Sequence, residues 1–122
     1  MDASFDIVAD PARDLIRLTM RGFFAEPDIV RMRASLLHTL TELHCAPNQH
    51  RTLCDIREMK IQSQESVTLF QNLVGSEPVR SRLLAFVTSA TLARLQARRL
   101  TSREGVQFFS NLEEASDWLE SS

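Results

Sequence analysis

The chain has 122 residues, which suits one domain, because domains usually hold about 100–150 residues. Hydrophobic residues make up 43% and charged residues 25% of the chain, as in ordinary globular proteins, which excludes a disordered tail, a collagen-like repeat and a coiled coil. With 14 basic and 16 acidic residues the formal charge is −2, so no strong field points to nucleic acid or to an anionic membrane.

The ends and the cysteines of the chain predict its compartment. The first six residues have no basic start and no long apolar stretch, so no secretory signal is expected. No window approaches about 18 uninterrupted apolar residues, so we expect no membrane insertion. Two cysteines, Cys45 and Cys54, are too few for a disulfide framework, and we expect a cytoplasmic protein that keeps them reduced.

The N-terminal segment predicts a β-hairpin. Phe5, Ile7 and Val8 indicate a short strand that stops at Asp10-Pro11, and the turn continues to Asp14. A second strand is predicted from Leu15 to Phe23, because its side chains alternate. The apolar face carries Ile16, Leu18 and Met20, and the polar face carries Arg17, Thr19 and Arg21.

A long amphipathic helix follows. Pro27 suits the first helical turn, where Glu26 and Asp28 complement the helix dipole. The helix is predicted to end near His44, before Pro47. Its apolar stripe comprises Ile29, Met32 or Arg33, Leu36, Leu40 and Leu43, widened by Val30 and Leu37.

The middle of the chain predicts a strand and a second helix. Thr52–Ile56 reads as a buried strand. Ser63 is a plausible N-cap, since its hydroxyl can accept from an unpaired amide of the first turn, and Gly75 ends the helix. The predicted apolar face of this helix is Val67, Phe70, Leu73 and Val74.

The last third predicts two further β–α units. Leu83–Thr88 is apolar on both alternating sets, as in a central strand covered on both sides. Ser89 or Thr91 caps a third helix, which carries Leu92, Leu95 and Leu100 and closes at Gly105. Val106–Phe109 forms the last strand. Ser110 and Glu113 fit a capping box for a fourth helix, with Leu112, Ala115, Trp118 and Leu119 facing inward.

This element order defines the fold class. Strands that alternate with helices need right-handed crossovers, which make a sheet mostly parallel. Only the first strand, which is reached by a hairpin, should run against its neighbour. We therefore predict one α/β domain over residues 1–122, with a five-stranded mixed sheet, four helices and the order β-β-α-β-α-β-α-β-α.

Catalytic and metal-binding signals are poor. The sequence has no GxGxxG, GxxxxGK[ST] or GxSxG motif. The best metal candidates are His44, Cys45, His50 and Cys54, but their spacing matches no common zinc pattern, and a buried core Cys54 with a solvated His44 is the favoured interpretation. We predict no metal and no cofactor.

Other reactive pairs are equally weak. A Cys54–His50 nucleophile pair is disfavoured because a reactive thiol needs a polar, accessible setting. Asp55 and Glu58 lie near a strand end, where acid–base groups often gather, but Asp55 more often binds nearby amides. The sequence therefore predicts no enzyme.

An arginine group stands out in the third predicted helix. It comprises Arg94, Arg98, Arg99 and Arg103, of which Arg94 and Arg98 share a helix face, whereas Arg98 is close to Arg99 in sequence only. A solvated helix surface is the favoured interpretation, and contact with an acidic partner or a phosphate is the alternative. Trp118 lies on an apolar stripe and is predicted to be a core residue rather than a ligand platform.

Four segments, with the element order, resemble a known family. They are Gly22-Phe23, Leu53–Ile56, the helix opened near Ser63, and Leu84–Val87. The chain resembles the SpoIIAA-like or STAS/SEC14 domain family, small bacterial proteins of unassigned role that are similar to anti-sigma-factor antagonists. The Arg-x-Leu-x-Asp-Ile strand of that family corresponds to Arg51, Leu53, Asp55 and Ile56.

The resemblance implies a regulatory role. Anti-sigma-factor antagonists carry an Asp-Ser-Ser-Gly type motif at the start of the helix after strand three, whose serine is phosphorylated by a partner kinase. The corresponding stretch here is Gln62–Ser66, in which the acidic residue and the glycine are missing. Only Ser63 and Ser66 could stand in for the acceptor, and an ordinary N-cap role is the favoured interpretation of Ser63.

Our first functional hypothesis is a non-enzymatic regulatory module that acts through protein–protein interaction. Its predicted surface is the loop after strand three and the start of the second helix. The predicted partner-binding or phospho-acceptor residues are Arg57, Glu58, Lys60, Gln62, Ser63, Glu65 and Ser66.

Two alternatives remain open. The SEC14-related resemblance implies binding of a small apolar or lipid-like ligand, with Met59, Ile61, Phe70 and Phe86 as the lining. The short first strand, as a predicted sheet edge with unpaired amides, also suits pairing with a second copy into a homodimer.

Overall fold

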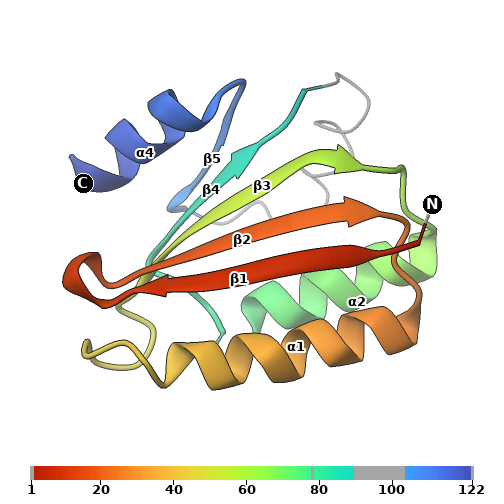
Figure 1. Cartoon of the computed structure of the whole chain (residues 1–122), viewed down its shortest axis with the longest axis horizontal. Helices are drawn as coiled ribbons and strands as arrows, with labels where there is room; N and C mark the ends of the chain where they lie inside the picture. Colours follow the sequence, from red (N-terminus) through yellow and green to blue (C-terminus); the bar gives the residue numbers. More distant parts are fainter. Residues whose placement is uncertain (1, 78, 90–103, 122) are drawn as a thin grey trace.

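The computed structural model describes residues 2–77, 79–89 and 104–121. These residues form a single five-stranded sheet with three α-helices (Figure 1). In chain order the elements are β1 (Ser4–Asp10), β2 (Leu15–Gly22), α1 (Glu26–Leu40), β3 (Arg51–Met59), α2 (Gln64–Gly75), β4 (Leu83–Val87), β5 (Val106–Phe109) and α4 (Leu112–Glu120). A single 3₁₀ turn, Pro11–Arg13, joins β1 to β2.

The sheet has the predicted mixed topology. Its strands follow the order β1-β2-β3-β4-β5, with β1 antiparallel to β2 and the other three pairings parallel. β3 and β4 lie side by side in the same direction, with Arg51 opposite Leu83 and Asp55 opposite Val87. The predicted hairpin and the predicted succession of β–α units are therefore confirmed for the described residues.

Helices cover both faces of the sheet. Figure 1 shows α1 and α2 beneath the sheet and α4 above it. The larger core lies between the sheet and α1 and α2, and includes the fully buried Ile16, Phe24 and Met32. A smaller core lies under α4 and is built from Leu15, Leu53, Ala85, Val87, Ala115 and Leu119. The alternation of β2 explains this division, since Ile16, Leu18 and Met20 all enter the larger core.

The first helix is shorter than predicted. α1 ends at Leu40 rather than near His44, because the chain tightens into three-residue turns. The amide and the hydroxyl of Thr41 both donate to the carbonyl of His38, and the Leu43 amide donates to Leu40. Val30, expected to widen the apolar stripe, is instead 60% exposed.

The start of the last helix is also shifted. Asn111, not Ser110, is the N-cap of α4, since its side-chain oxygen accepts from the Glu114 amide at 2.9 Å. Leu112, which was predicted to face inward, is the first residue of α4 and is 39% exposed, while Ala115 and Leu119 are buried as predicted. Trp118 is half-buried and packs against Phe109, with ring centroids 5.7 Å apart.

One predicted helix lies outside the described residues. The third predicted helix, between Thr91 and Gly105, lies almost entirely within residues 90–103, outside the described residues. The arginine group of that helix lies there too.

Candidate functional site

The predicted surface lies where β2 and β3 end and α2 begins. Two of its residues, Arg57 and Glu58, are not in a loop, because β3 continues to Met59 and pairs with β2 as far as Gly22. The loop proper is only residues 60–63. The polar end of β3 shows no alternation that would predict this extension from the sequence.

A β-bulge near the end of β3 determines the face of the sheet on which these side chains lie. Thr19 pairs with Asp55, but Arg21 pairs with Glu58, so β3 contains one residue more than β2 over this stretch. Such a bulge reverses the alternation of side chains along the strand. Asp55 and Glu58, three positions apart, therefore lie on the same face of the sheet, the one covered further along by α4.

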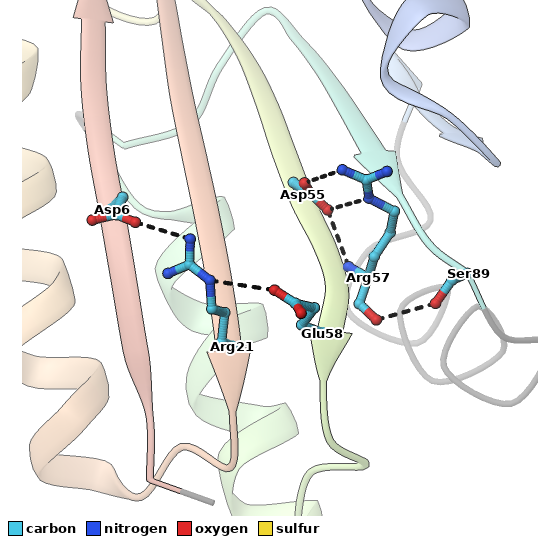
Figure 2. A network of polar contacts seen from close by, with 6 residues as sticks. All are labelled: Asp6, Arg21, Asp55, Arg57, Glu58 and Ser89. Atoms are coloured by element: carbon cyan, nitrogen blue, oxygen red, sulfur yellow. Dashed lines mark hydrogen bonds and ion pairs between the residues drawn. The ribbon is translucent and has the colours of Figure 1, made fainter.

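Charged side chains on this face are paired with one another (Figure 2). Arg21 lies between two carboxylates, 3.0 Å from Asp6 and 3.4 Å from Glu58. The Arg57 guanidinium donates two hydrogen bonds to Asp55, at 3.0 Å from Nε and 2.8 Å from Nη2.

The backbone of Arg57 completes this second pair. Its amide also donates to the Asp55 carboxylate, at 3.1 Å, and its carbonyl accepts from the Ser89 hydroxyl at 3.1 Å. The bulge is therefore held by Asp55 within β3 and joined to the end of β4.

This arrangement keeps Asp55 ionised. Partial burial acts to raise the pKa of Asp55, but the hydrogen bonds from Arg57 and the charges of Arg57 and Arg21 outweigh it, so the pKa is lowered. A carboxylate held in this way is poorly suited to donate a proton as a general acid near neutral pH. The favoured prediction for Asp55, binding nearby amides, agrees with its contact to the Arg57 amide.

Asp55 should make stability pH-dependent in acid. Because its pKa is lowered in the folded state, its contribution is present above the unfolded value of about 3.9 and is lost as pH falls through the lowered value. The difference in unfolding free energy between the wild type and Asp55→Asn should be constant above about pH 5 and shrink below about pH 4. The change should be modest, since Arg57 is 39% exposed.

Urea denaturation from neutral to acid pH measures this difference. Arg57→Gln is the matched control, because it removes the main partner of Asp55 while keeping the carboxylate. In that background Asp55→Asn should have a smaller pH-dependent effect. A difference between wild type and Asp55→Asn that does not change with pH would contradict the assignment.

Two of the predicted site residues are buried and structural. The side-chain oxygen of Gln62 accepts from the Phe24 amide at 2.8 Å, and its amide group donates to the carbonyls of Gly22, at 3.0 Å, and Lys60. The buried Ser66 hydroxyl donates to the Phe24 carbonyl at 2.6 Å. Gln62 and Ser66 therefore fasten the β2–α1 connection to the start of α2, and neither offers its side chain to a partner.

Ser63 is the N-cap of α2, as predicted. Its hydroxyl oxygen accepts from the Ser66 amide at 3.1 Å and lies 3.1 Å from the Ser66 hydroxyl. Unlike Ser66, Ser63 is exposed. Five of the seven predicted partner-binding residues are thus accessible, and we call them the strand-end surface: Arg57, Glu58, Lys60, Ser63 and Glu65.

The interior holds an apolar cavity of about 50 Å³ between the sheet and the helices beneath it. Three of the residues predicted to bind an apolar ligand, Met59, Phe70 and Phe86, do line it. Ile61 does not, because the loop turns its side chain outward, where it is 52% exposed. Ligand sites usually measure about 300–1,000 Å³, so this cavity is too small for a lipid chain.

Two larger hollows lie open on the face of the sheet that carries α4. One, of about 490 Å³, lies between β2, β3 and α4, and includes Arg17, Glu113 and Asp117. The other, of about 470 Å³, lies over the paired charges and includes Arg57, Glu58 and Ser89. They share Thr19 and Asp55, so both adjoin the ends of β2 and β3.

The candidate metal and nucleophile residues differ in their burial. Cys54 is buried in β3, and burial raises the pKa of its thiol, as does the neighbouring Asp55 charge. His50 is buried, with Nε2 3.2 Å from the Val79 carbonyl, whereas His44 is exposed. Within residues 2–77, 79–89 and 104–121, no three His, Cys, Asp or Glu side chains are grouped to hold a metal ion.

Comparison with known proteins identifies the fold. The chain matches no protein-family model and no curated protein. It is similar to the crystal structure of an uncharacterised DUF3478-family protein with a SpoIIAA-like fold from Shewanella loihica, at 20% identity and a TM-score of 0.70, over 96% of this chain and 93% of that one. An anti-sigma factor antagonist from Mycobacterium paratuberculosis is similar at 6% identity and a TM-score of 0.64, over 98% and 95%.

These likenesses place the chain in a structural class. It has a SpoIIAA-like, STAS-type α/β fold, which confirms at the level of the fold the resemblance seen in the sequence. No helix in the described part of the chain is both long and apolar enough to cross a membrane.

Proposed function

We propose that this chain is a non-enzymatic regulatory module of the cytoplasm that binds a protein partner through the strand-end surface. The observation that supports the proposal is that the charged side chains near this surface are paired with one another within the chain. Arg21 and Arg57 are already engaged by carboxylates of the same chain, and Asp55 is held ionised by Arg57. Charged groups that neutralise one another in this way are poorly suited to proton transfer, and they leave a polar, nearly neutral surface of the kind that forms the rim of a protein interface.

The fold supports the same proposal. One structural neighbour is an anti-sigma factor antagonist, a protein whose name states that it acts against another protein. The two thiols, Cys45 and Cys54, are unpaired, as suits a reducing compartment. Catalysis by Cys54 is disfavoured because its thiol is buried and its pKa is raised.

Within this proposal, Ser63 is the residue where a phosphate would act. Ser63 is an exposed residue at the N-cap of α2, where a negative charge is electrostatically favourable, whereas Ser66 is buried and its hydroxyl donates to the Phe24 carbonyl. A phosphate on Ser63 would add charge to the strand-end surface between Lys60 and Glu65 without entering the core. Regulation by phosphorylation at this position would therefore change binding and leave the fold intact.

Two substitutions at Ser63 separate the charge from the helix cap. Ser63→Asp adds charge and keeps an N-cap acceptor, so it should weaken partner capture about tenfold while changing the unfolding free energy by less than about 0.5 kcal/mol. Ser63→Ala removes the cap without adding charge, so it should lower the unfolding free energy by about 1 kcal/mol and leave capture intact. Quantitative affinity capture and urea denaturation measure the two effects.

The matched control is Ser121→Asp, which adds the same charge at the exposed C-cap of α4. It should leave partner capture unchanged. Equal losses for Ser63→Asp and Ser121→Asp would show that net charge alone is responsible. No loss with Ser63→Asp would remove Ser63 from the proposed surface.

A further inference from the structure

Two large apolar side chains are exposed beside the strand-end surface. Phe23, directly after β2, is 43% exposed, and Ile61, in the loop after β3, is 52% exposed. Single exposed apolar residues are common, but neighbouring ones often mark a binding surface. The sequence suggested that Ile61 lines an interior site, and Phe23 was not singled out for binding.

Backbone and side-chain hydrogen bonds hold the two segments together. The Lys60 amide donates to the Gly22 carbonyl at 3.0 Å. Gln62 reaches across to the same carbonyl at 3.0 Å and to the Phe24 amide at 2.8 Å. Phe23 thus lies between Gly22 and Phe24, and Ile61 lies between Lys60 and Gln62, the four residues that make these hydrogen bonds.

The burial pattern gives the direction of both side chains. Gly22, Phe24 and Gln62 are buried, whereas Phe23 and Ile61, on the same two hydrogen-bonded segments, are exposed to solvent. The conformation of Gly22, with φ of 83°, favours glycine and lets the chain leave β2 in this direction. The residues on either side of Phe23 and Ile61 make these hydrogen bonds. Neither side chain can therefore turn into the core without breaking them.

The surrounding charge argues for an apolar occupant. Arg21 is shared by Asp6 and Glu58, and Arg57 is engaged by Asp55. The remaining charges of the strand-end surface, Lys60 and Glu65, are of opposite sign. An anionic membrane or a nucleic acid needs an excess of positive charge, which this surface lacks.

We infer that Phe23 and Ile61 form the apolar anchor of the interface, inserted into an apolar groove on a protein partner. This inference rests on the proposed function and adds to it the chemistry of the partner. Burying a large aromatic and a large aliphatic side chain in such a groove would supply most of the binding free energy, with the charged residues as a rim. Binding should then depend only weakly on salt.

Site-specific photo-crosslinking in cells that naturally make the chain tests this. A benzophenone side chain replaces Phe23, Ile61 or Glu65 in separate variants, and Val30 or Leu112, which are also exposed apolar positions, in the controls. We expect one adduct of the same mass from positions 23, 61 and 65 and none from 30 or 112. Ile61→Ser should lower the adduct yield from position 23 about tenfold.

The purified adduct partner then gives the deciding readout. Its affinity for the wild type should change by less than about threefold between about 0.05 and 0.5 M salt, and fall about tenfold with Phe23→Ser. An adduct from position 65 without one from 23 or 61 would overturn the anchor and leave the proposed function standing. No adduct from 23, 61 or 65 would overturn both.

Other occupants give distinct results, each of which overturns the inference. A second copy would yield an adduct of twice the chain mass and a concentration-dependent dimer in light scattering. A membrane would show as binding of the wild type, and not of Phe23→Ser, to vesicles containing phosphatidylglycerol. A partner whose affinity falls steeply with salt would show that the charged rim, and not the apolar pair, dominates.

Discussion

Replacing Phe24 by alanine is expected to lower the free energy of unfolding by about 3–5 kcal/mol, the usual cost of removing a buried phenyl ring. The Phe24 side chain is 0% exposed. Its ring meets that of Phe70 edge-on, with centroids 5.6 Å apart, so α2 would lose a contact to the segment that precedes α1. Urea denaturation of the two proteins measures the difference.

The neighbouring phenylalanine provides the matched control. Phe23→Ala removes the same atoms from a position that is 43% exposed and should change stability by no more than about 0.5–1 kcal/mol. The two variants together test the outward direction of Phe23, on which the proposed anchor depends. Equal destabilisation by both would contradict it.

Replacing Gln62 by methionine is expected to cost about 2–3 kcal/mol, because the substitution keeps the length of the side chain but removes its hydrogen bonds. The Phe24 amide would lose its partner in a buried setting, and the Gly22 carbonyl would keep only the Lys60 amide. The stability loss should appear in chemical denaturation. Amide hydrogen exchange should show the β2–α1 connection opening more readily.

Gln64→Met is the control for this experiment. Gln64 is exposed at the start of α2, two residues away, so the same change there should be nearly neutral. Stability equal to that of the wild type in Gln62→Met would show that Gln62 does not fasten the two segments.

The assignment of Gln62 and Ser66 to structure changes the comparison with anti-sigma-factor antagonists. The resemblance implied that a serine of this stretch is phosphorylated, and both Ser63 and Ser66 were candidates. The hydroxyl of Ser66 is committed to the Phe24 carbonyl at 2.6 Å inside the protein. Of the two serines only Ser63 is exposed, so the proposed phosphorylation is tested at Ser63.

The sequence predicted the strands and helices well where side chains repeat with a clear period. In β2 the alternation of Ile16, Leu18 and Met20 with polar residues defined both the strand and its core face, and the continuous apolar run of β4 defined a strand covered on both sides. Such patterns are local consequences of burial, so they are readable without a structure. The order of these elements then fixed the parallel sheet through the handedness of crossovers.

Errors occurred where no period is present. The polar end of β3 does not alternate, because the bulge after Asp55 interrupts the pattern, so Arg57 and Glu58 were placed in a loop. The one-residue shift of the α4 cap arose because Ser110 and Asn111 are both good N-caps, and local chemistry does not choose between them.

The chain by itself therefore determined the α/β class, the order of the elements along the chain and the segment to which the proposed surface belongs. Which residues of that segment are accessible was decided only by tertiary contacts. The partners of Gln62 and Ser66 are backbone groups of Phe24, 38 and 42 positions away, and no local pattern reports a hydrogen bond across that separation. For the same reason the outward direction of Phe23 and Ile61 became visible only once their two segments were seen fastened together.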